Sequence, residues 1–534
     1  MGTYLNPNNE NFRSFVATGT YVDKTMLVDV LNQKNLNVSE FKFVCVSRPR
    51  RFGKSIAEDM LSAYYSKGAD SKELFAPYKL SKTEHFEKHL NKYNVLKIDL
   101  NAMYSKWRSL SPADREGQSF MGYVAKLLCA DFAEYFSDVK FPDELSVADF
   151  IQNVYAQKKE TFIIIIDEYD VLVREQVPQE EFSVYLAFLN SLFKRRELLP
   201  AISLAYITGI LPIIKDKIQS KLNTFHEYTM LDAGPLAEFV GFTADEVQSL
   251  CEKYQCSFEE CKSWYDGYQL DNYEIYNPQA VYNAMISKKF KSYWTATSSY
   301  TVVADKICMN FSGTKDDVIS MLGGGRIRVN VEKYENTIDA FYDKDDVFTY
   351  LIHLGYLAYD EKEGECYIPN REILNEWQKA IKNNEDYFET DKIISASREL
   401  LEATLAGDEK SVAAALDKSH YHVTSNLSYN NEKSLQSAIY LAYIYALNNY
   451  VITKEMPAGK GFADIVYIPF DKTKAALIIE LKHNKSTETA LNQIKEKKYS
   501  ECLANWQGDI LFVGVNYDEK TKHHECQIEE FYKD

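Results

Sequence analysis

One stretch constrains the fold of this chain more than any other: an apolar strand that runs into a short basic loop. The stretch is Phe43-Val-Cys-Val-Ser-Arg-Pro-Arg-Arg-Phe-Gly-Lys-Ser55. In a phosphate-binding loop, a glycine lets backbone N–H groups close on phosphate oxygens, a lysine reaches the β- and γ-phosphates, and a serine hydroxyl ligates Mg²⁺. Gly53, Lys54 and Ser55 can fill these roles. The general pattern has a first glycine where this chain has Arg48, so a basic turn between a strand and a helix is the alternative.

A second apolar run ends in acidic residues. It is Thr161-Phe-Ile-Ile-Ile-Ile-Asp-Glu-Tyr-Asp170, which is typical of a central parallel strand covered on both faces. Asp167 is then expected at the carboxyl end of the strand, where it would hold Mg²⁺ through water, and Glu168 would polarise an attacking water. A third strand ends at Thr208, which we expect to touch the γ-phosphate or that water. A threonine at a strand end is also common without any function.

Strands and helices alternate through the first 230 residues, which predicts a doubly wound parallel sheet. A later pair of strands carries a second group of charged residues. A turn centred on residue 472 would place Asp464 directly across from Glu480, with Cα atoms about 4.5–5.5 Å apart. Two carboxylates at that separation repel each other unless a cation lies between them, and Mg²⁺ fits. Lys482 shares a face with Glu480 and would orient or deprotonate the attacking water. The alternative is an ordinary pair of exposed acids, but the flanking residues are apolar, and charges there are costly unless they have a role.

Composition limits the partners. The chain has 534 residues, enough for three or four domains, and a formal net charge of −17. An extended, non-specific grip on DNA is therefore disfavoured, and any nucleic-acid contact needs local basic surface. The candidates are Lys485, Lys495, Lys497 and Lys498, for which a solvated helix face is the alternative. No secretory segment or membrane-spanning run is visible, so we expect a cytoplasmic protein without membrane contact. The nine cysteines lack a C-x-x-C pair and are expected to be reduced, and the residues around His523 are expected to form a solvated tail rather than a metal site.

Several motifs together resemble the AAA-ATPase-like family of bacterial proteins. They are Tyr21-Val-Asp-Lys-Thr25, Arg48-Pro-Arg-Arg-Phe-Gly-Lys-Ser55, Ile166-Asp-Glu-Tyr-Asp170, Ile207-Thr-Gly-Ile210, Trp264-Tyr-Asp-Gly-Tyr268, Ile275-Tyr-Asn-Pro278 and Tyr293-Trp-Thr-Ala-Thr-Ser-Ser299. That family carries arginine in place of the first loop glycine, so the resemblance implies that Arg48, Pro49, Arg50, Arg51 and Phe52 belong to the ATP-binding loop. It also implies a regulatory ATPase of the STAND type, followed by a domain of the PD-(D/E)XK nuclease superfamily.

The C-terminal residues fit that second expectation. Asp464, Glu480 and Lys482 resemble the D…E-x-K constellation of these nucleases, in which a metal-bound hydroxide attacks a phosphodiester. Glu432 matches an acidic residue that such domains often carry on the preceding helix. Gln493 and Tyr499 resemble the Gln…Tyr helix of the RecB-like branch, whereas Gln436 stands where relatives often have histidine.

The expected architecture is therefore α/β in four parts. Residues 1–230 form a P-loop ATPase domain, 231–300 a helical lid, 301–384 a winged-helix-like spacer and 385–534 a nuclease-like domain. The first functional hypothesis is an ATP-regulated, Mg²⁺-dependent nuclease that cuts DNA rather than RNA, in defence or genome maintenance. The alternative is a nucleotide-dependent switch or scaffold that binds a protein partner through a non-catalytic nuclease fold. Assembly into a homo-oligomer is left open.

Overall fold

The computed structural model describes residues 2–36, 41–115, 117–141, 146–213, 224–294, 301–335, 340–382, 384–423, 432–471, 473–503 and 506–531. The chain divides into two compact units that interleave along the sequence. The first unit comprises Met1–Lys253, Tyr268–Ile286 and Asn330–Glu361, and the second comprises Tyr254–Gly267, Ser287–Val329 and Lys362–Asp534. The four domain limits expected from the sequence stay predictions.

The first unit is built on a sheet of five parallel strands in the order β2-β3-β4-β1-β5. The strands are β1 (Phe43–Ser47), β2 (Asn94–Asp99), β3 (Phe162–Asp167), β4 (Ile202–Gly209) and β5 (His226–Tyr228). Every residue of β1, β3 and β4 is buried, as their continuous apolar sequences predict. Because these three strands are parallel neighbours, their carboxyl ends meet at one edge of the sheet.

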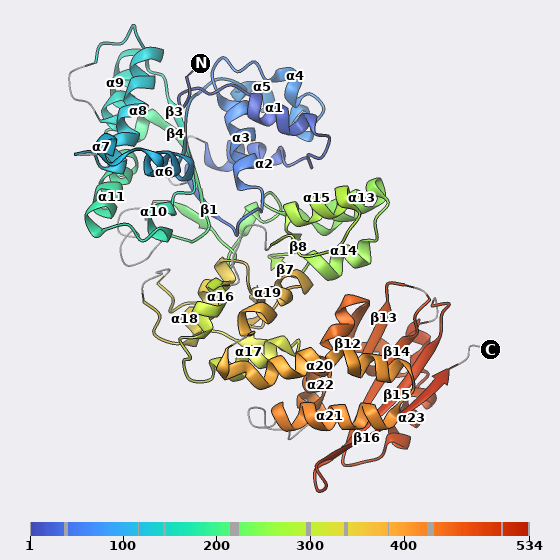
Figure 1. Cartoon of the computed structure of the whole chain (residues 1–534). Helices are drawn as coiled ribbons and strands as arrows, with labels where there is room; N and C mark the ends of the chain where they lie inside the picture. The colour runs from blue at the N-terminus through green and yellow to red at the C-terminus, as the bar shows by residue number, and fades with distance from the viewer. Residues whose placement is uncertain are drawn as a thin grey trace. The chain divides into compact units, whose positions relative to one another are not determined.

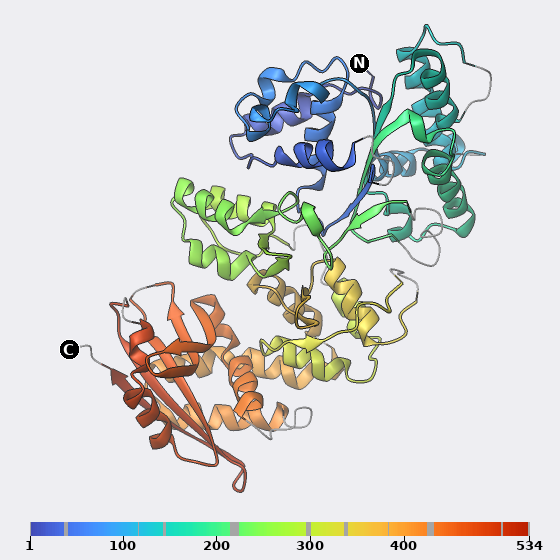
Figure 2. The ribbon, with the colours of Figure 1, turned by 180° about the vertical axis from the view of Figure 1, so that it is seen from behind.

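Helices cover both faces of this sheet (Figures 1 and 2). One group lies on the side of the phosphate-loop helix and consists of α1 (Glu10–Ala17), α2 (Met26–Val30), α3 (Lys54–Tyr65), α4 (Lys72–Phe75) and α5 (Phe86–His89). The other group includes α6 (Leu100–Ser109), α8 (Phe120–Tyr135), α9 (Val147–Lys158) and α11 (Gln179–Phe193). Their apolar faces form the main core with the strands. The doubly wound parallel sheet expected from the sequence is confirmed.

The rest of the first unit adds a small antiparallel sheet in the order β6-β8-β7. Its strands are β6 (Phe242–Thr243), β7 (Tyr268–Leu270) and β8 (Tyr273–Tyr276), flanked by α13 (Ala244–Tyr254) and α15 (Pro278–Ser287). These strands were not expected in a segment with helical spacing. Tyr268 contacts Phe52 edge to face, with ring centres 5.5 Å apart, so the small sheet packs against the phosphate loop. Helix α18 (Lys344–His353) and strand β10 (Ala358–Asp360) also belong to this unit.

The second unit contains a mixed sheet in the order β12-β13-β14-β15-β16. The strands are β12 (Tyr450–Ala458), β13 (Gly461–Pro469), β14 (Ala476–His483), β15 (Ile510–Asp518) and β16 (His523–Phe531). Only β14 and β15 pair in parallel, and α23 (Thr487–Glu496) connects them. In the β13–β14 hairpin Ile465 faces Ile479 and Tyr467 faces Leu477, which is the register predicted from the sequence. Residue 472, on which that prediction was centred, lies outside the described residues.

The two faces of this sheet carry different helices. Val466 and Ile478 pack with Leu491 and Ile494 of α23. The neighbouring Tyr467 points the other way, and its ring centre lies 5.7 Å from that of Tyr443, which follows α22 (Glu432–Ala442) and precedes the 3₁₀ helix η8 (Ile444–Asn448). Because side chains alternate along a strand, Glu480 shares the α23 face with Ile478.

The remaining helices of the second unit are α14 (Phe258–Tyr265), α16 (Thr301–Ile307), α17 (Thr314–Leu322), α19 (Arg371–Ile381), α20 (Phe388–Leu405) and α21 (Glu409–Val423). The short strands β9 (Ile327–Arg328) and β11 (Glu365–Tyr367) pair with each other. The glycine turn at residues 323–325 is closely packed rather than open, because a Cβ on Gly324 would lie 3.1 Å from Lys454 Nζ.

The structure also bears on two further expectations, the one for the segment around His523 and the one for the cysteines. His523 begins the edge strand β16, and His524 is buried beside Asp417, so the solvated tail expected there is wrong. The reason is that β16 pairs along its whole length with β15. The nine cysteines are free. Within the described part of the chain, no helix has the length and apolar character needed to cross a membrane.

Candidate active sites

The phosphate loop connects the end of β1 to the start of α3, and in this structure its lysine is folded back onto it. Lys54 Nζ donates hydrogen bonds to the carbonyl oxygens of Arg48 (3.0 Å) and Pro49 (3.1 Å). Gly53, the residue before the helix, has φ +92°, a value that glycine adopts without strain. Phosphate oxygens would have to replace the two carbonyl oxygens as partners of the ammonium group.

Arg48 lies inside the protein instead of lining the phosphate side of the loop. Its guanidinium donates to the carbonyl oxygens of Ser47 (2.9 Å), Tyr228 (3.0 Å) and Thr229 (2.8 Å). Complete burial lowers its pKa to about 10. Arg48 therefore ties the loop to β5. Of the other loop residues expected to bind ATP, Pro49 and Phe52 are buried, Arg50 is exposed and Arg51 has a positive φ of 70°.

Ser55, Asp167 and Thr208 meet at the carboxyl edge of the sheet. Ser55 Oγ donates to Asp167 Oδ2 over 2.6 Å. Thr208 Oγ1 lies 2.7 Å from Asp167 Oδ1 and 2.6 Å from Glu58 Oε1. A hydroxyl has one proton to donate, so the second short contact needs a proton on a carboxyl group. Glu58 is fully buried, and burial together with the nearby Asp167 raises its pKa well above the usual range, so Glu58 holds that proton.

Sequence reasoning missed Glu58. The only signal was an acidic residue at a position of α3 that faces the sheet, four residues after Lys54. Its partner Thr208 is 150 residues away, and nothing local marks the contact.

Glu168, expected to act on the attacking water, is held by two cations. It forms an ion pair with Arg174, and its Oε1 lies 3.8 Å from Lys54 Nζ. Its backbone has φ +54°, which is unusual for a non-glycine residue. Burial raises the pKa of Glu168, and the charges of Lys54 and Arg174 oppose that rise. Arg174 also contacts Asp170, whose carboxylate accepts from the backbone N–H groups of Ile210 and Leu211, so it connects the ends of β3 and β4. Arg174 too was missed from the sequence.

The second candidate site lies on the β13–β14 hairpin. Continuing the observed register by one residue places Asp464 opposite Glu480. Asp464 Oδ2 accepts the backbone N–H of Leu481 over 2.7 Å, which fixes the aspartate beside β14. Glu480 is 1 % exposed, and burial, then the charge of Asp464, raises its pKa to about 7. The two carboxylates are therefore close enough to oppose each other's ionisation.

Three further predicted residues surround Glu480. Lys482 Nζ donates to Glu480 Oε1 over 2.7 Å and to the carbonyl oxygen of Leu481 over 3.1 Å. Gln493 of α23 donates to the same oxygen of Glu480 and also to the hydroxyl of Tyr499, 3.0 Å away. Helix α23 can lie this close because β15 has Gly514 beside Glu480, where a Cβ would come within 2.8 Å of the Thr487 carbonyl oxygen. The structure thus brings Asp464, Glu480, Lys482, Gln493 and Tyr499 together.

The donor set suits a hard divalent cation. Glu480 Oε2 is buried and has no hydrogen-bond partner, while Oε1 has two donors. A carboxylate oxygen in that state, next to a second carboxylate, is where Mg²⁺ would gain two oxygen ligands. Among the described residues there is no cluster of three or more His, Cys, Asp or Glu side chains that could hold a metal, so water and substrate oxygens would complete the coordination.

Two other expected residues lie nearby on α22. Gln436 donates to the carbonyl oxygen of Asp464 over 2.8 Å, so it holds β13 from the other face of the sheet. Glu432 is the first residue of α22, and its side chain lies outside the described residues. Of the motif that begins at Tyr293, residues 295–299 are also outside them.

Comparison with known proteins gives one family match for each of the two regions that carry the candidate sites. Residues 9–219 match the family described as predicted AAA-ATPase, and residues 430–526 match the PD-(D/E)XK nuclease superfamily. The chain joins an AAA-ATPase-like domain to a PD-(D/E)XK nuclease superfamily domain. The AAA-ATPase-like domain carries the phosphate loop, and the nuclease superfamily domain carries the β13–β14 hairpin.

A curated relative offers no function. It is an uncharacterised protein from the vnfD 5′ region of Azotobacter chroococcum mcd 1, 23% identical over 292 residues, which are 53% of this chain and 52% of the relative. The match thus spans about half the length of that relative. Two Aeropyrum pernix structures are also similar. They are ORC2 in ADPNP–ADP complexes (TM-score 0.31, 10% identity, covering 67% of this chain and 92% of that one) and ORC1 in complex with DNA (TM-score 0.22, 12% identity, 91% and 95%). Scores this low support no inference about this chain.

Proposed function

We propose that this protein is an ATP-regulated, metal-dependent nuclease that hydrolyses phosphodiesters of DNA. The combination of an AAA-ATPase-like domain with a nuclease superfamily domain points to a nucleotide-dependent nuclease. The observation that carries the proposal is the hydrogen-bonded group around Glu480, whose Oε2 is buried without a partner beside Asp464. Because two donors already bind Oε1, the unpartnered Oε2 is the oxygen that a cation shared with Asp464 would bind.

Each residue of that group has a task in the proposed reaction. A divalent cation held by Asp464 and Glu480 would supply Lewis acidity toward the scissile phosphate. Lys482 binds Glu480 Oε1 now, and its ammonium group is placed to orient the water whose oxygen forms the new bond to phosphorus. Gln493 fixes the Glu480 carboxylate from α23 and is itself held by Tyr499. The attacking water loses a proton to solvent as its oxygen bonds to phosphorus, and the leaving oxygen takes a proton from solvent as its P–O bond breaks.

The ATP side of the proposal rests on Lys54, Ser55, Asp167 and Thr208. These residues lie at one edge of the parallel sheet, around the loop that closes on phosphate in P-loop proteins. Mg²⁺ would be held by Ser55 and Asp167, which are now bonded to each other. For Glu168 to act on a water, it would have to leave Arg174, so nucleotide binding is expected to rearrange this ion pair.

The preference for nucleic acid is supported by a local basic and aromatic surface. The hairpin tip at Lys460 donates its backbone N–H to the carbonyl oxygen of Lys497 over 2.9 Å, and a Cβ on Gly461 would lie 3.2 Å from the Tyr499 hydroxyl. Lys460, Lys497 and Lys498 are exposed, and Phe462, two residues before Asp464, is 62% exposed. Lysines that meet phosphates beside an aromatic ring that stacks on bases are the features of a single-strand binding surface. Of these neighbouring lysines, Lys495 pairs with Glu529 and Lys498 with Glu501.

A cleavage assay tests the proposal. The purified 534-residue chain is incubated with single- and double-stranded DNA and RNA, with Mg²⁺ or Mn²⁺, and with or without ATP. We expect metal-dependent cleavage that ATP alters and that Glu480→Gln abolishes. Glu488→Gln, an exposed glutamate on α23, is the matched control and should cleave normally.

The competing function is a nucleotide-dependent switch or scaffold with a non-catalytic nuclease fold, which the net charge of −17 favours. Absence of cleavage under every condition, together with calorimetry that shows no Mn²⁺ uptake that depends on Asp464 and Glu480, would establish that reading. Uptake of Mn²⁺ without cleavage would leave the metal site standing and refute the nuclease activity.

A further inference from the structure

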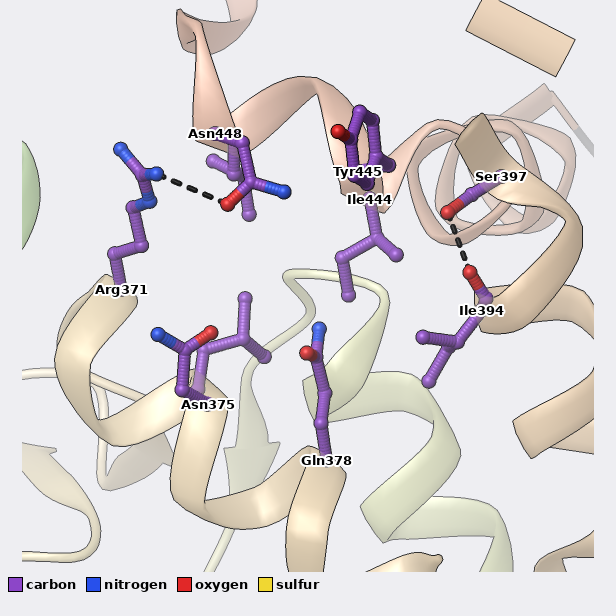
Figure 3. A pocket seen from close by; sticks show the side chains of 10 residues that line it. Arg371, Asn375, Gln378, Ile394, Ser397, Ile444, Tyr445 and Asn448 are labelled. Atoms are coloured by element: carbon purple, nitrogen blue, oxygen red, sulfur yellow. Dashed lines mark hydrogen bonds between the residues drawn. The ribbon is translucent and has the colours of Figure 1, made fainter. Parts of the chain in front are cut away.

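The second unit contains a small pocket that includes none of the residues of the two candidate active sites. It lies between α19, α20 and η8, is partly open to solvent and offers a volume of about 70 Å³ (Figure 3). Its lining consists of Arg371, Leu374, Asn375, Gln378, Ile394, Ser397, Ile444, Tyr445, Leu447 and Asn448. The lining has one cation, several hydrogen-bonding side chains and no acidic residue, although the chain as a whole is strongly acidic.

The cation is buried and is not neutralised by the described residues. Arg371 is 6% exposed, and its guanidinium carbon lies 3.9 Å from the ring centre of Trp264. Nη2 donates to Asn448 Oδ1 over 3.1 Å, and Nη1 is buried with no hydrogen-bond partner. Burial lowers its pKa to about 10, and the charge of Glu260 only partly opposes that change. A buried guanidinium without a carboxylate at ion-pair distance is costly, unless an anion from outside joins it.

The side chains around Arg371 can donate to such an anion. Arg371, Asn375 and Gln378 are spaced by four and three residues, so they lie on one face of α19. Figure 3 shows the carboxamides of Asn375 and Gln378 reaching toward the space below Tyr445 and Asn448. Because Asn448 Oδ1 accepts from Arg371, its amide nitrogen remains available as a donor.

We propose that this pocket binds an oxyanion of the phosphate class. A guanidinium together with neutral amide and hydroxyl donors is the set that recognises phosphate oxygens. The available space is several times what one bound water needs, and the pocket is partly open to solvent, so a phosphate group can enter it. The group can come from free phosphate or from the end of a nucleic-acid strand, and the inference does not depend on the proposed cleavage activity.

The experiment measures phosphate binding by the full-length chain carrying Lys54→Ala, so that the ATP loop contributes little, in buffer with EDTA. Isothermal titration with inorganic phosphate is compared with a 5′-phosphorylated dinucleotide and with the same dinucleotide lacking that phosphate. The decisive variant is Asn448→Asp, which places a carboxylate at the same position. It should pair with Arg371 and repel an incoming anion, so we expect at least a tenfold loss of phosphate affinity with an unfolding temperature equal to or above that of the parent.

Lys392→Gln is the control. Lys392 is an exposed cation on α20 that pairs with Glu389 and does not line the pocket, so its loss removes the same charge and should change phosphate affinity less than twofold. Failure of the parent to bind any of the three ligands at 20 mM overturns the proposal, as does equal phosphate affinity in Asn448→Asp. A lower unfolding temperature of Asn448→Asp also overturns it, because Arg371 would then already have had a counter-ion. Dinucleotide binding that needs the 5′-phosphate assigns the pocket to strand ends, whereas binding of inorganic phosphate alone assigns it to the free ion.

Discussion

Each of the two candidate active sites contains a lysine and acidic residues, but the hydrogen-bond partners of these side chains differ between the two sites. At the phosphate loop, both oxygens of Asp167 have hydroxyl partners, Ser55 and Thr208, and Lys54 is bonded to carbonyl oxygens of its own loop. At the β13–β14 hairpin, Lys482 is bonded to the carboxylate beside it, and Glu480 Oε2 has no partner.

The difference indicates which site must rearrange to work. The lysine of the loop has to exchange partners before it can bind a phosphate, whereas the hairpin residues already hold their expected positions. Regulation by ATP would then act through rearrangement of the first site, with the second site assembled in advance.

The sharpest way to break this comparison is to remove the lysine of the preassembled site. Lys482→Ala should lower the cleavage rate by about 10²–10³-fold, the range for loss of one positioned hydrogen-bond donor at a reaction centre. Lys410→Ala, an exposed lysine on α21, is the control and should keep the parental rate. Single-turnover cleavage of a labelled oligonucleotide gives the rate. Parental activity in Lys482→Ala would show that the hairpin residues are not the catalytic group.

The corresponding change in the other site should affect binding rather than the hairpin. Lys54→Ala removes charge-assisted bonds to phosphate and should weaken ATP binding by about 10–100-fold, measured by titration with a fluorescent ATP analogue. Mn²⁺ uptake at Asp464 and Glu480 should not change. Lys106→Ala, on the exposed side of α6, serves as the reference. Unchanged ATP affinity in Lys54→Ala would remove the loop from the proposal.

Phe462 distinguishes substrate binding from catalysis at the hairpin. Loss of one stacked base should weaken binding of single-stranded DNA by about tenfold, because base–aromatic stacking contributes about 1–3 kcal/mol. The measurement is fluorescence anisotropy with Phe462→Ala in Ca²⁺, which is expected to support binding without cleavage. Phe388→Ala, at another exposed phenylalanine of the second unit, should bind like the parent. Equal affinities for all three proteins would exclude Phe462 from the substrate surface.

The smallest expected effect is the pH dependence that Glu480 gives to the stability of the second unit. Glu480 has a pKa of about 7 in the folded protein, raised by burial and then by Asp464, above its ordinary value. The folded state therefore binds the proton more tightly than the unfolded state. The resulting stabilisation is complete below the unfolded pKa and disappears as pH rises through about 7.

In EDTA, the unfolding temperature of the second unit should fall by about 1–3 °C more between pH 5 and 8 in the parent than in Glu480→Gln. Added Mn²⁺ should reverse the difference above pH 7, because the cation binds the ionised form. Differential scanning calorimetry checks both results. Identical pH profiles for parent and variant would mean that Glu480 is not the buried, perturbed carboxyl described above.

The functional residues at the strand ends could be predicted from the sequence because their positions depend on the local pattern of apolar and polar residues. Apolar runs ending in Asp167 and Thr208 predicted parallel strands, and the structure places the two strands side by side with these residues in contact. The position of Asp464 opposite Glu480 followed from counting along a hairpin, since side chains alternate and pairing advances by one residue at a time. The two family matches confirm the expected combination of an AAA-ATPase-like domain with a PD-(D/E)XK nuclease superfamily domain.

The tertiary structure alone decided which side chains from distant segments share a carboxylate or a cation. Glu58 of α3 contacts Thr208 of β4, and Arg174 forms an ion pair with Glu168. The side chain of Arg48 points toward β5 and not toward the phosphate side of the loop. The pocket around Arg371 likewise needs α19, α20 and η8 to be packed together. Sequence pattern reports the periodicity of one element at a time, whereas burial and charge neutralisation depend on how several elements pack, which no local pattern contains.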